Sequence, residues 1–140
     1  MNRKLVQFIL ISFFFCLMSG VAFASSLTGQ EILEQFNLVV LDDATSTSHV
    51  DGRTYVGGKL TGGDYVQHPD STPTSAYAGL TVKENASNIH VNGLGTVIDG
   101  NLTNSIINTG EAVVLGTASS NTFNNPAYVG NDGGNNNLWL

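Results

Sequence analysis

The stretch IHVNGLGTVIDGNLTNSIINTGEAVV, residues 89–114, decides the fold class, because short apolar segments alternate in it with Gly, Asn, Asp and Ser. Apolar side chains stand at Ile89, Val97, Ile106 and Val114, so successive segments follow each other at eight or nine residues. Such spacing, with a turn between neighbouring segments, is typical of a sandwich of short strands or of the stacked strands of a β-solenoid.

The turns between these segments favour the solenoid. A sandwich would place two-residue hairpin connections at alternate turns, whereas nearly every expected strand here is four or five residues long and ends on Gly or Asn. Both residues tolerate a positive φ, and together they make up a quarter of residues 25–140. We therefore predict an all-β fold, a right-handed β-solenoid with a short N-terminal capping helix, and keep a β-sandwich as the alternative.

The N-terminus has the pattern of an export signal. Arg3 and Lys4 precede an apolar stretch over residues 5–21, and Ala22-Phe23-Ala24 supplies the small-x-small pattern that a signal peptidase accepts. We predict a cleaved signal peptide over residues 1–24 and one secreted or cell-surface domain over residues 25–140. An uncleaved membrane anchor is the alternative, but the stretch is shorter than the ~20 apolar residues that a spanning helix needs.

The charge and the cysteine content exclude several classes of function. The chain carries 11 acidic against 5 basic residues, and removal of Arg3 and Lys4 with the signal leaves a net charge of −8. Nucleic acids and anionic lipids bind basic surfaces, so we expect no nucleic-acid partner. The single cysteine, Cys16, lies in the export signal, which excludes a disulfide scaffold, a zinc–cysteine site and a cysteine nucleophile from the exported domain.

One helix is predicted near the start of the exported domain. Thr28 and Glu31 form a capping-box pattern, flanked by Leu27 and Ile32 at the positions of a hydrophobic staple. We expect a helix from residue 29 to about residue 36. The helix positions expected to pack on the core are Ile32, Leu33 and Phe36.

Three other segments frame the solenoid. The apolar run over residues 37–41 predicts a strand buried on both sides. Residues 67–78, with two prolines and many hydroxyl side chains, predict a surface excursion from the coil. After the Asn- and Gly-rich residues 121–137, the apolar residues 138–140 predict the start of another strand, as in an N-terminal fragment of a longer protein.

The sequence resembles the choice-of-anchor A family of bacterial secreted proteins. The resemblance rests on the run Phe36-Asn37-Leu38-Val39-Val40-Leu41 and above all on Val50-Asp51-Gly52-Arg53-Thr54-Tyr55-Val56-Gly57-Gly58, and it fades beyond about Gly116. It implies an ice-binding-like adhesive domain built as a β-solenoid, displayed outside the cell by an anchor that differs between members. It implies no enzymatic activity.

The residues of the family motif have two interpretations. Asp51-Gly52-Arg53 would place a carboxylate and a guanidinium on one exposed turn, but Asp and Gly are also favoured in turns for backbone reasons. We interpret the motif as a structural turn in which Arg53 pairs with a neighbouring acid. The residues assigned to it are Val50, Asp51, Gly52, Arg53, Val56, Gly57 and Gly58. The glycine pairs lack the helix and lysine of a phosphate-binding loop, so no small-molecule cofactor is expected.

Calcium is the metal ion whose binding the sequence leaves as an open question. Oxygen-rich turns offer the hard ligands that Ca²⁺ requires, although none completes a known calcium-binding loop. The candidate ligands are Asp42, Asp43, Asp99, Asn101 and Asp132. The histidines lack a second ligand at metal-binding spacing, and we interpret all three as surface or turn residues: His49, His68 and His90.

The composition favours an adhesive function. Asn, Ser, Thr and Gly offer many hydrogen bonds at little charge, so stacked coils would present a broad polar strip to a repetitive partner. We predict a non-enzymatic adhesin that binds glycan, matrix or another cell surface. The aromatic side chains to examine for exposure are Tyr55, Tyr65, Tyr77 and Trp139, the first two being more typical of a core.

Two alternative functions, enzymatic and ice-binding, would need different arrangements of side chains. A polysaccharide-active enzyme would need two converging carboxylates, for which Asp99 with Glu111, or Asp42 with Asp43, are the pairs to consider. An ice-binding protein would need one hydroxyl position repeated in successive coils. The later threonines are unevenly spaced along the chain and do not form such a ladder: Thr81, Thr96, Thr103, Thr109 and Thr117.

Overall fold

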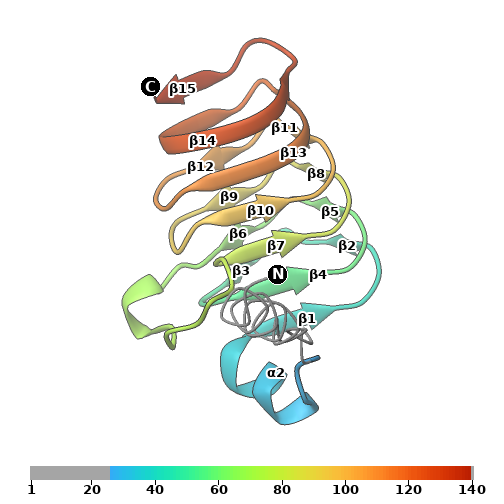
Figure 1. Ribbon diagram of the computed structural model, residues 1–140, viewed down its shortest axis with the longest axis vertical. Coiled ribbons are helices and arrows are strands. Elements are labelled where there is room, and N and C mark those ends of the chain that lie inside the picture. Colours follow the sequence, from blue (N-terminus) through green and yellow to red (C-terminus); the bar gives the residue numbers. More distant parts are fainter. Residues whose placement is uncertain (1–25, 140) are drawn as a thin grey trace, which may run out of the picture.

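The computed structural model describes residues 26–139, with side chains up to residue 137. The predicted signal peptide, residues 1–24, lies outside the described residues. The described chain winds into a β-solenoid of about six coils, with one short α-helix below its first coil (Figure 1). Neither helix within residues 26–139 is long and apolar enough to cross a membrane.

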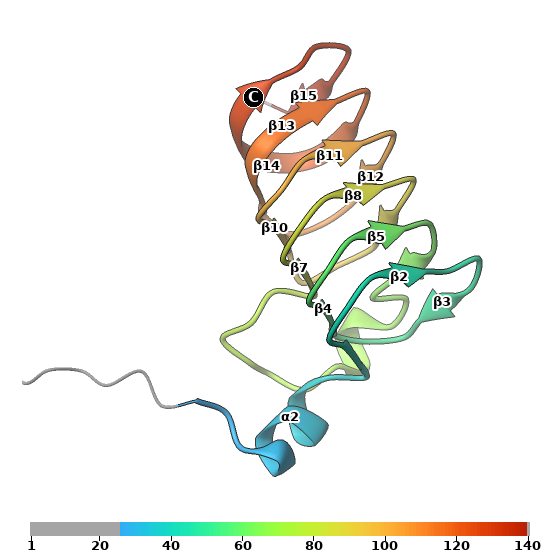
Figure 2. The same cartoon turned by 90° about the vertical axis from the view of Figure 1, so that its right-hand side faces the viewer.

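Each coil contributes short parallel strands to three faces, which Figures 1 and 2 show from two sides. Face 1 contains β1 (Leu38–Val40), β4 (Thr54–Val56), β7 (Leu80–Val82), β10 (Thr96–Ile98) and the first half of β13 (Ala112–Ser119). Face 2 contains β2 (Ala44–Thr45), β5 (Leu60–Thr61), β8 (Ala86–Ser87), β11 (Leu102–Thr103) and the second half of β13. Face 3 contains β3 (His49–Val50), β6 (Asp64–Tyr65), β9 (His90–Val91), β12 (Ile106–Ile107) and β15 (Asn137–Trp139). The long strand β14 (Thr122–Asp132) begins on face 3 and continues across faces 1 and 2 of the last coil.

The strand register gives the length of a coil. Leu80 pairs with Thr96, and Thr96 pairs with Ala112. One coil therefore takes 16 residues, the same separation that joins hydrogen-bonded partners such as Asn85 and Asn101. The spacing of eight or nine residues in the sequence is thus half a coil, the step between face 3 and face 1. The expected strand length of four or five residues is wrong, because most strands have two or three residues while β13 has 8 and β14 has 11.

The core is a narrow column between the three faces. Because each strand has one side facing inward, its alternate residues stack on those of the coils above and below. The buried apolar side chains are Val56, Leu60, Tyr65, Val66, Leu80, Val82, Ala86, Ile89, Val91, Ile98, Leu102, Ile107, Ala112, Val114, Ala118 and Phe123. Tyr65 is thus in the core, as expected, and its hydroxyl donates to the Gly62 carbonyl oxygen at 3.0 Å.

Asn and Gly form the corner between faces 2 and 3. The corner residue has a positive φ in successive coils, at Gly62, Asn88 and Asn104, a conformation that Gly and Asn adopt most readily. Asn121 lies one residue past this corner in the next coil. It is buried, and its Oδ1 accepts the Ser105 N–H at 3.0 Å. These corners satisfy the backbone where strand pairing stops.

The helix α2 (Gly29–Gln35) confirms the predicted element. Thr28 is the N-cap, and both hydrogen bonds of the capping box with Glu31 are present. The packing prediction is wrong for Leu33, which is 83% exposed, and no residue of the helix is fully buried. A helix lying outside the column buries one narrow edge, so of the three predicted packing positions Ile32 and Phe36 are half-buried.

The strand expected to be buried on both sides is half-exposed. In β1, Leu38 and Val40 face the column and Val39 faces outward, and beyond the strand Leu41 is 84% exposed. A solenoid has one interior, so each strand has one buried side only. The apolar residues of the outer side consequently remain uncovered.

The segment 67–78 is an excursion from the coil, as predicted, and bulges away from the stack (Figure 2). Across it, Asp64 pairs with His90, a step of 26 residues where an ordinary coil takes 16. The excursion contains the 3₁₀-helix η1 (Pro69–Ser71). The strand expected after residue 137 is also present as β15.

Candidate functional site

Outward hydroxyl side chains repeat at one position of face 2 in five successive coils. The strand register pairs each of them with the next, so they form one row along the solenoid axis, which we call the hydroxyl ladder: Thr45, Thr61, Ser87, Thr103 and Ser119. The first two are exposed and the others half-exposed. Neighbouring strands lie about 4.8 Å apart, so the ladder repeats its hydroxyl group at that interval. Figure 2 shows the strands β2, β5, β8 and β11 of this face stacked in order.

The sequence pattern alone does not reveal this ladder. Of the threonines considered for a ladder, the structure places Thr81, Thr96 and Thr103 on three different rows: outward on face 1, inward on face 1 and outward on face 2. That set of five threonines indeed forms no ladder. The true row can be recognised only when the length of a coil and the length of the excursion are both known.

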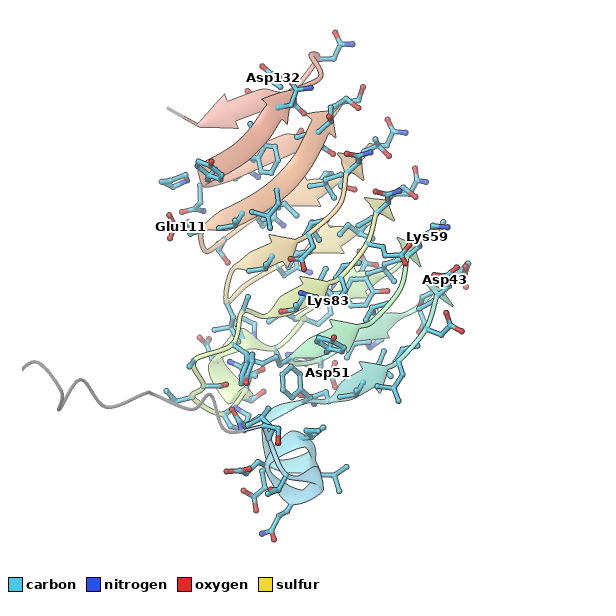
Figure 3. All side chains as sticks on the ribbon, turned by 45° about the vertical axis from the view of Figure 1, so that its right-hand side comes forward. Asp43, Asp51, Lys59, Lys83, Glu111 and Asp132 are labelled. Carbon is cyan, nitrogen blue, oxygen red and sulfur yellow. The ribbon has the colours of Figure 1, made fainter. Side chains whose placement is uncertain are left out.

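A second row of side chains, at the corner between faces 1 and 2, holds the coils at fixed spacing. Asp43 accepts the N–H of Lys59 at 2.7 Å, Asn85 that of Asn101 at 2.8 Å, and Asn101 that of Thr117 at 2.8 Å, always through Oδ1. Asp43 and Lys59 lie together at this corner in Figure 3. The row orders the backbone directly beside the hydroxyl ladder.

Face 3 carries a hydrogen-bonded polar network. The Asp64 carboxylate lies 3.1 Å from His90 Nδ1, and Asn108 Nδ2 lies 2.7 Å from His90 Nε2. Asn108 also donates to Asn92 Oδ1 at 3.0 Å, and Asn124 donates to Asn108 Oδ1 at 3.0 Å. Both ring nitrogens of His90 thus have a hydrogen-bond partner, which fixes the orientation of the ring. His90 is therefore part of a network, whereas His49 and His68 are exposed, as expected.

A shallow hollow of about 310 Å³ lies beside this network. Its lining includes Asp64 and His90 and the left-handed corner residues Asn88 and Asn104. Ile106, which is 42% exposed, supplies an apolar patch. The hollow is polar and open, without the enclosure that small-molecule sites normally have.

The family motif forms a turn around a buried arginine. Arg53 is 2% exposed and donates to three backbone carbonyl oxygens: from Nε to Tyr77 at 2.9 Å, and from Nη1 to Gln35 at 3.1 Å and Pro73 at 3.0 Å. The expected pairing of Arg53 with an acid is wrong: within the described residues its guanidinium bonds to these carbonyl oxygens and forms no ion pair with a carboxylate. Burial lowers the pKa of the guanidinium. Arg53 ties the helix end and the excursion to the first coils.

The other motif residues lie in and around the same turn. Val50 lies in β3 and Val56 in the core, while Asp51 is exposed between His49 and His68, with Nε2–Oδ1 distances of 3.8 and 3.7 Å. A side chain at Gly52 would overlap the Asn37 amide, at Gly57 the Leu41 carbonyl, and at Gly58 the Asp43 carboxylate. These three glycines permit close approach of neighbouring coils.

The structure does not bring the calcium candidates together. Asp42 and Asp43 precede β2, and Asp43 is used by the Lys59 N–H. Asp99 forms an ion pair with Lys83, Asn101 accepts the Thr117 N–H, and Asp132 accepts from Gly134 N–H and Asn136. These bonds lower the pKa of Asp132. Within residues 26–139, no three His, Cys, Asp or Glu side chains are grouped to hold a metal ion.

The acid pairs considered for hydrolysis differ in placement. Asp99 follows the end of β10, whereas Glu111 precedes the start of the neighbouring strand β13, so about 13 Å of strand separates the two positions. Retaining and inverting glycosidases hold their carboxylates about 5 to 10 Å apart. Asp42 and Asp43 are adjacent in the chain, and Asp42 Oδ1 accepts the Asp43 N–H at 2.9 Å.

Outward aromatic side chains lie on or near face 1. Tyr55 is half-exposed in β4, and Tyr77 is 42% exposed beside Phe36. Tyr128, which no sequence pattern singles out, is 63% exposed in β14. The side chain of Trp139 lies outside the described residues.

The comparisons with known proteins agree with this architecture. Residues 29–138 match the family model described as an ice-binding-like adhesive domain. No curated protein and no solved structure matches the chain. The match spans the helix, every coil and both polar rows, and the choice-of-anchor A resemblance stays a prediction. By this match the chain belongs to the ice-binding-like adhesive domain family.

Proposed function

We propose that this domain is a non-enzymatic, extracellular adhesin that binds a repetitive, hydroxyl-rich partner, a glycan of a matrix or cell surface, along face 2. Membership of an adhesive-domain family supports the general class. The observation that carries the choice of face is the hydroxyl ladder, five outward Thr and Ser side chains in continuous register.

The chemistry of the ladder suits a neutral polymer. Each hydroxyl group both donates and accepts a hydrogen bond, and the backbone fixes the repeat at about 4.8 Å. Single contacts of this kind are weak, because each replaces a hydrogen bond to water. Many copies on one cell would raise the apparent affinity by ~10² to 10⁴ through avidity, so an adhesin of this kind needs no deep pocket.

The test compares the exported protein with Thr61→Val and Thr103→Val variants on a glycan array and in a cell-attachment assay. Valine keeps the branched shape and removes the hydroxyl group, so we expect folded variants that lose most array binding and attachment. Thr74→Val, in the exposed excursion, is the matched control and should bind like the wild type. Equal binding by all three variants, or turnover of a polysaccharide, would contradict the proposal.

Ice binding is the second candidate, because the same ladder offers the repeated hydroxyl position that a crystal surface requires. An ice-recrystallisation assay with the same variants distinguishes the two. Inhibition by the wild type that Thr103→Val abolishes, together with a blank glycan array, would favour ice. Glycan binding without inhibition of recrystallisation would favour the adhesin.

A further inference from the structure

Exposed apolar side chains concentrate on face 1. Among the residues that the structure describes, eight large apolar side chains are exposed, and four of them lie on this face: Val39, Leu41, Leu115 and Tyr128. Tyr77 and Leu94 lie at its rim, around a hollow shared with Val97 and Val113. An apolar face of this kind marks an interaction surface.

Two outward rows make up face 1, and the strand register fixes their order from the first coil to the sixth. Row 1 reads Val39, Tyr55, Thr81, Val97, Val113, Tyr128. Row 2, two residues further along each strand, reads Leu41, Gly57, Lys83, Asp99, Leu115, Gly130. Figure 3 shows Lys83 near the middle of the stack.

Each row matches a copy of itself laid in the opposite direction, in the size and charge of the side chains that face each other. If row 2 is laid against a reversed copy, Leu41 faces Gly130, Gly57 faces Leu115, and Lys83 faces Asp99. Each large side chain meets a glycine and each charge meets its opposite. In row 1, the reversed copy places Tyr128 over Val39 and Tyr55 over Val113, again a large side chain against a smaller one. A face-to-face copy with its solenoid axis in the same direction would instead bring row 1 of one copy against row 2 of the other, so that Thr81 meets Lys83 and the apolar Val97 meets the charged Asp99.

We propose that face 1 is a self-association surface, on which a second copy of this chain docks with its solenoid axis antiparallel. The two-fold axis would run parallel to the strands, between the third and fourth coils. Such an isologous interface requires that residue i contacts residue j and that j contacts i, which both rows satisfy.

Charge supports a second copy as the occupant. Residues 25–140 carry a net charge of −8, so two copies repel each other over most of their surfaces. On the two rows of face 1, Lys83 and Asp99 form an ion pair and cancel. Glu111 lies at the rim of this face rather than in either row.

An apolar groove at the first coil would receive a large side chain of the second copy. The groove holds about 270 Å³ between the helix and the face, and its lining includes Phe36, Val39, Leu41 and Tyr55. In the antiparallel arrangement, Tyr128 of the second copy lies over Val39, at the groove. A large aromatic side chain in an apolar pocket is the usual anchor of an interface.

The size of the face predicts a weak dimer. Six coils at about 4.8 Å give a face about 24 Å long, and its two rows are about 7 Å apart. Interfaces this small belong to the transient class, so we expect a dissociation constant in the micromolar range or above. The hydroxyl ladders of both copies stay free on face 2, which would double the adhesive surface.

The test uses charge reversal and mixing, followed by sedimentation equilibrium of the exported protein up to millimolar concentration. Lys83→Asp places two acids, and Asp99→Lys two bases, at the centre of each face. We expect each variant alone to dimerise at least tenfold more weakly than the wild type. A mixture of the two should form a heterodimer at least as strong as the wild-type dimer. The matched control is Lys59→Asp, which breaks the Lys59–Glu84 pair at the corner between faces 1 and 2, outside both rows. This variant should dimerise normally.

A second pair of variants tests the anchor without touching charge in the monomer. Tyr128→Ala and Leu115→Ala remove exposed side chains, so the fold should persist by circular dichroism while dimerisation weakens at least tenfold. A wild-type protein that stays monomeric at millimolar concentration would overturn the proposal and indicate another occupant of the face. A dimer that tolerates Tyr128→Ala, or a mixture without heterodimer, would overturn the antiparallel arrangement.

Discussion

At the scale of single residues, two buried hydroxyl groups within the described part of the column lack hydrogen-bond partners, Thr54 Oγ1 and Thr96 Oγ1. Burying an unpaired hydroxyl group costs free energy that a methyl group of the same shape does not. We expect Thr96→Val to raise the free energy of unfolding by about 1 kcal/mol, measured by urea denaturation. The half-exposed Thr103→Val is the control and should change little; a loss of stability in Thr96→Val would contradict the prediction.

Gly57 is a second position where one added atom should change the stability of the solenoid. Its φ is not positive, so the backbone there is open to any residue, but a Cβ would overlap the Leu41 carbonyl oxygen of the coil below. We expect Gly57→Ala to lower the free energy of unfolding by about 1 to 3 kcal/mol through overpacking. Gly29→Ala is the matched control, since nothing lies within 4 Å of its Cβ position. Equal stability of the two variants would show that the coils separate freely.

Residue roles were predictable where the partners are close in sequence. The capping box of Thr28 and Glu31 joins neighbouring positions of one helix turn and was predicted correctly. Arg53 was expected to pair with an acid, yet its carbonyl partners, Gln35, Pro73 and Tyr77, lie far away in the chain, in the helix end and the excursion. A guanidinium satisfied by distant backbone leaves no local pattern, so only the structure identifies its role.

At the scale of elements, the N-terminal helix depends on its cap. Hydrogen bonds from the Thr28 backbone and side chain lower the pKa of Glu31 from its usual 4.5. The stabilisation that goes with this shift is fully present above pH 4.5 and is lost as the pH falls through the lowered value. We expect Thr28→Ala to cost the helix about 1 kcal/mol and to raise the Glu31 pKa only part of the way back toward 4.5, because the backbone N–H of residue 28 still donates to the carboxylate. NMR titration of Glu31 and amide hydrogen exchange in residues 29–35 measure the two effects.

Thr74→Ala, in the exposed excursion, is the control for that experiment and should leave both readouts unchanged. A Glu31 pKa and hydrogen exchange that are both unchanged in Thr28→Ala would contradict the role given to the Thr28 side chain.

The solenoid was predictable from the sequence, but face 2 was not. Apolar pairs such as Val97-Ile98 and Ile106-Ile107 mark faces 1 and 3. On face 2 the inward positions are single residues, several of them alanines such as Ala86 and Ala118, and these give no apolar pair. The sequence period therefore corresponds to half a coil, and no apolar period marks the hydroxyl ladder beside those alanines.

At the scale of the whole molecule, the surface rows depend on the register of distant strands. The extra residues of the excursion lie between β4 and β7, so equal positions in successive coils are not equally spaced in the sequence. Both the hydroxyl ladder of face 2 and the self-complementary rows of face 1 appear only after that offset is known. The stacking of coils then turns a low-charge sequence into two surfaces with different chemistry, one hydroxyl-rich and one apolar.

The stacking also predicts that a coil can be added. Solenoid stability is approximately a sum of repeat and nearest-neighbour terms, and the coil over residues 96–111 can stack on a copy of itself. Its inward residues Ile98, Leu102 and Ile107 would each meet an identical side chain, and Asn101 would accept the N–H of the inserted Asn101 as it now accepts that of Thr117. Asp99 and Glu111 would each meet a like charge, so Asp99→Asn and Glu111→Gln are included in the inserted copy.

We expect insertion of this second copy after Glu111 to raise the free energy of unfolding by roughly 1 to 2 kcal/mol, at about 0.05–0.15 kcal/mol per added residue, and to extend the hydroxyl ladder by one threonine. Urea denaturation measures the gain, and glycan binding measures the longer ladder. An inserted coil with Leu102→Asp is the matched control, because it has the same length but places a charge in the column. A lower stability of the first insertion than of the wild type would contradict the view that the coils are interchangeable units.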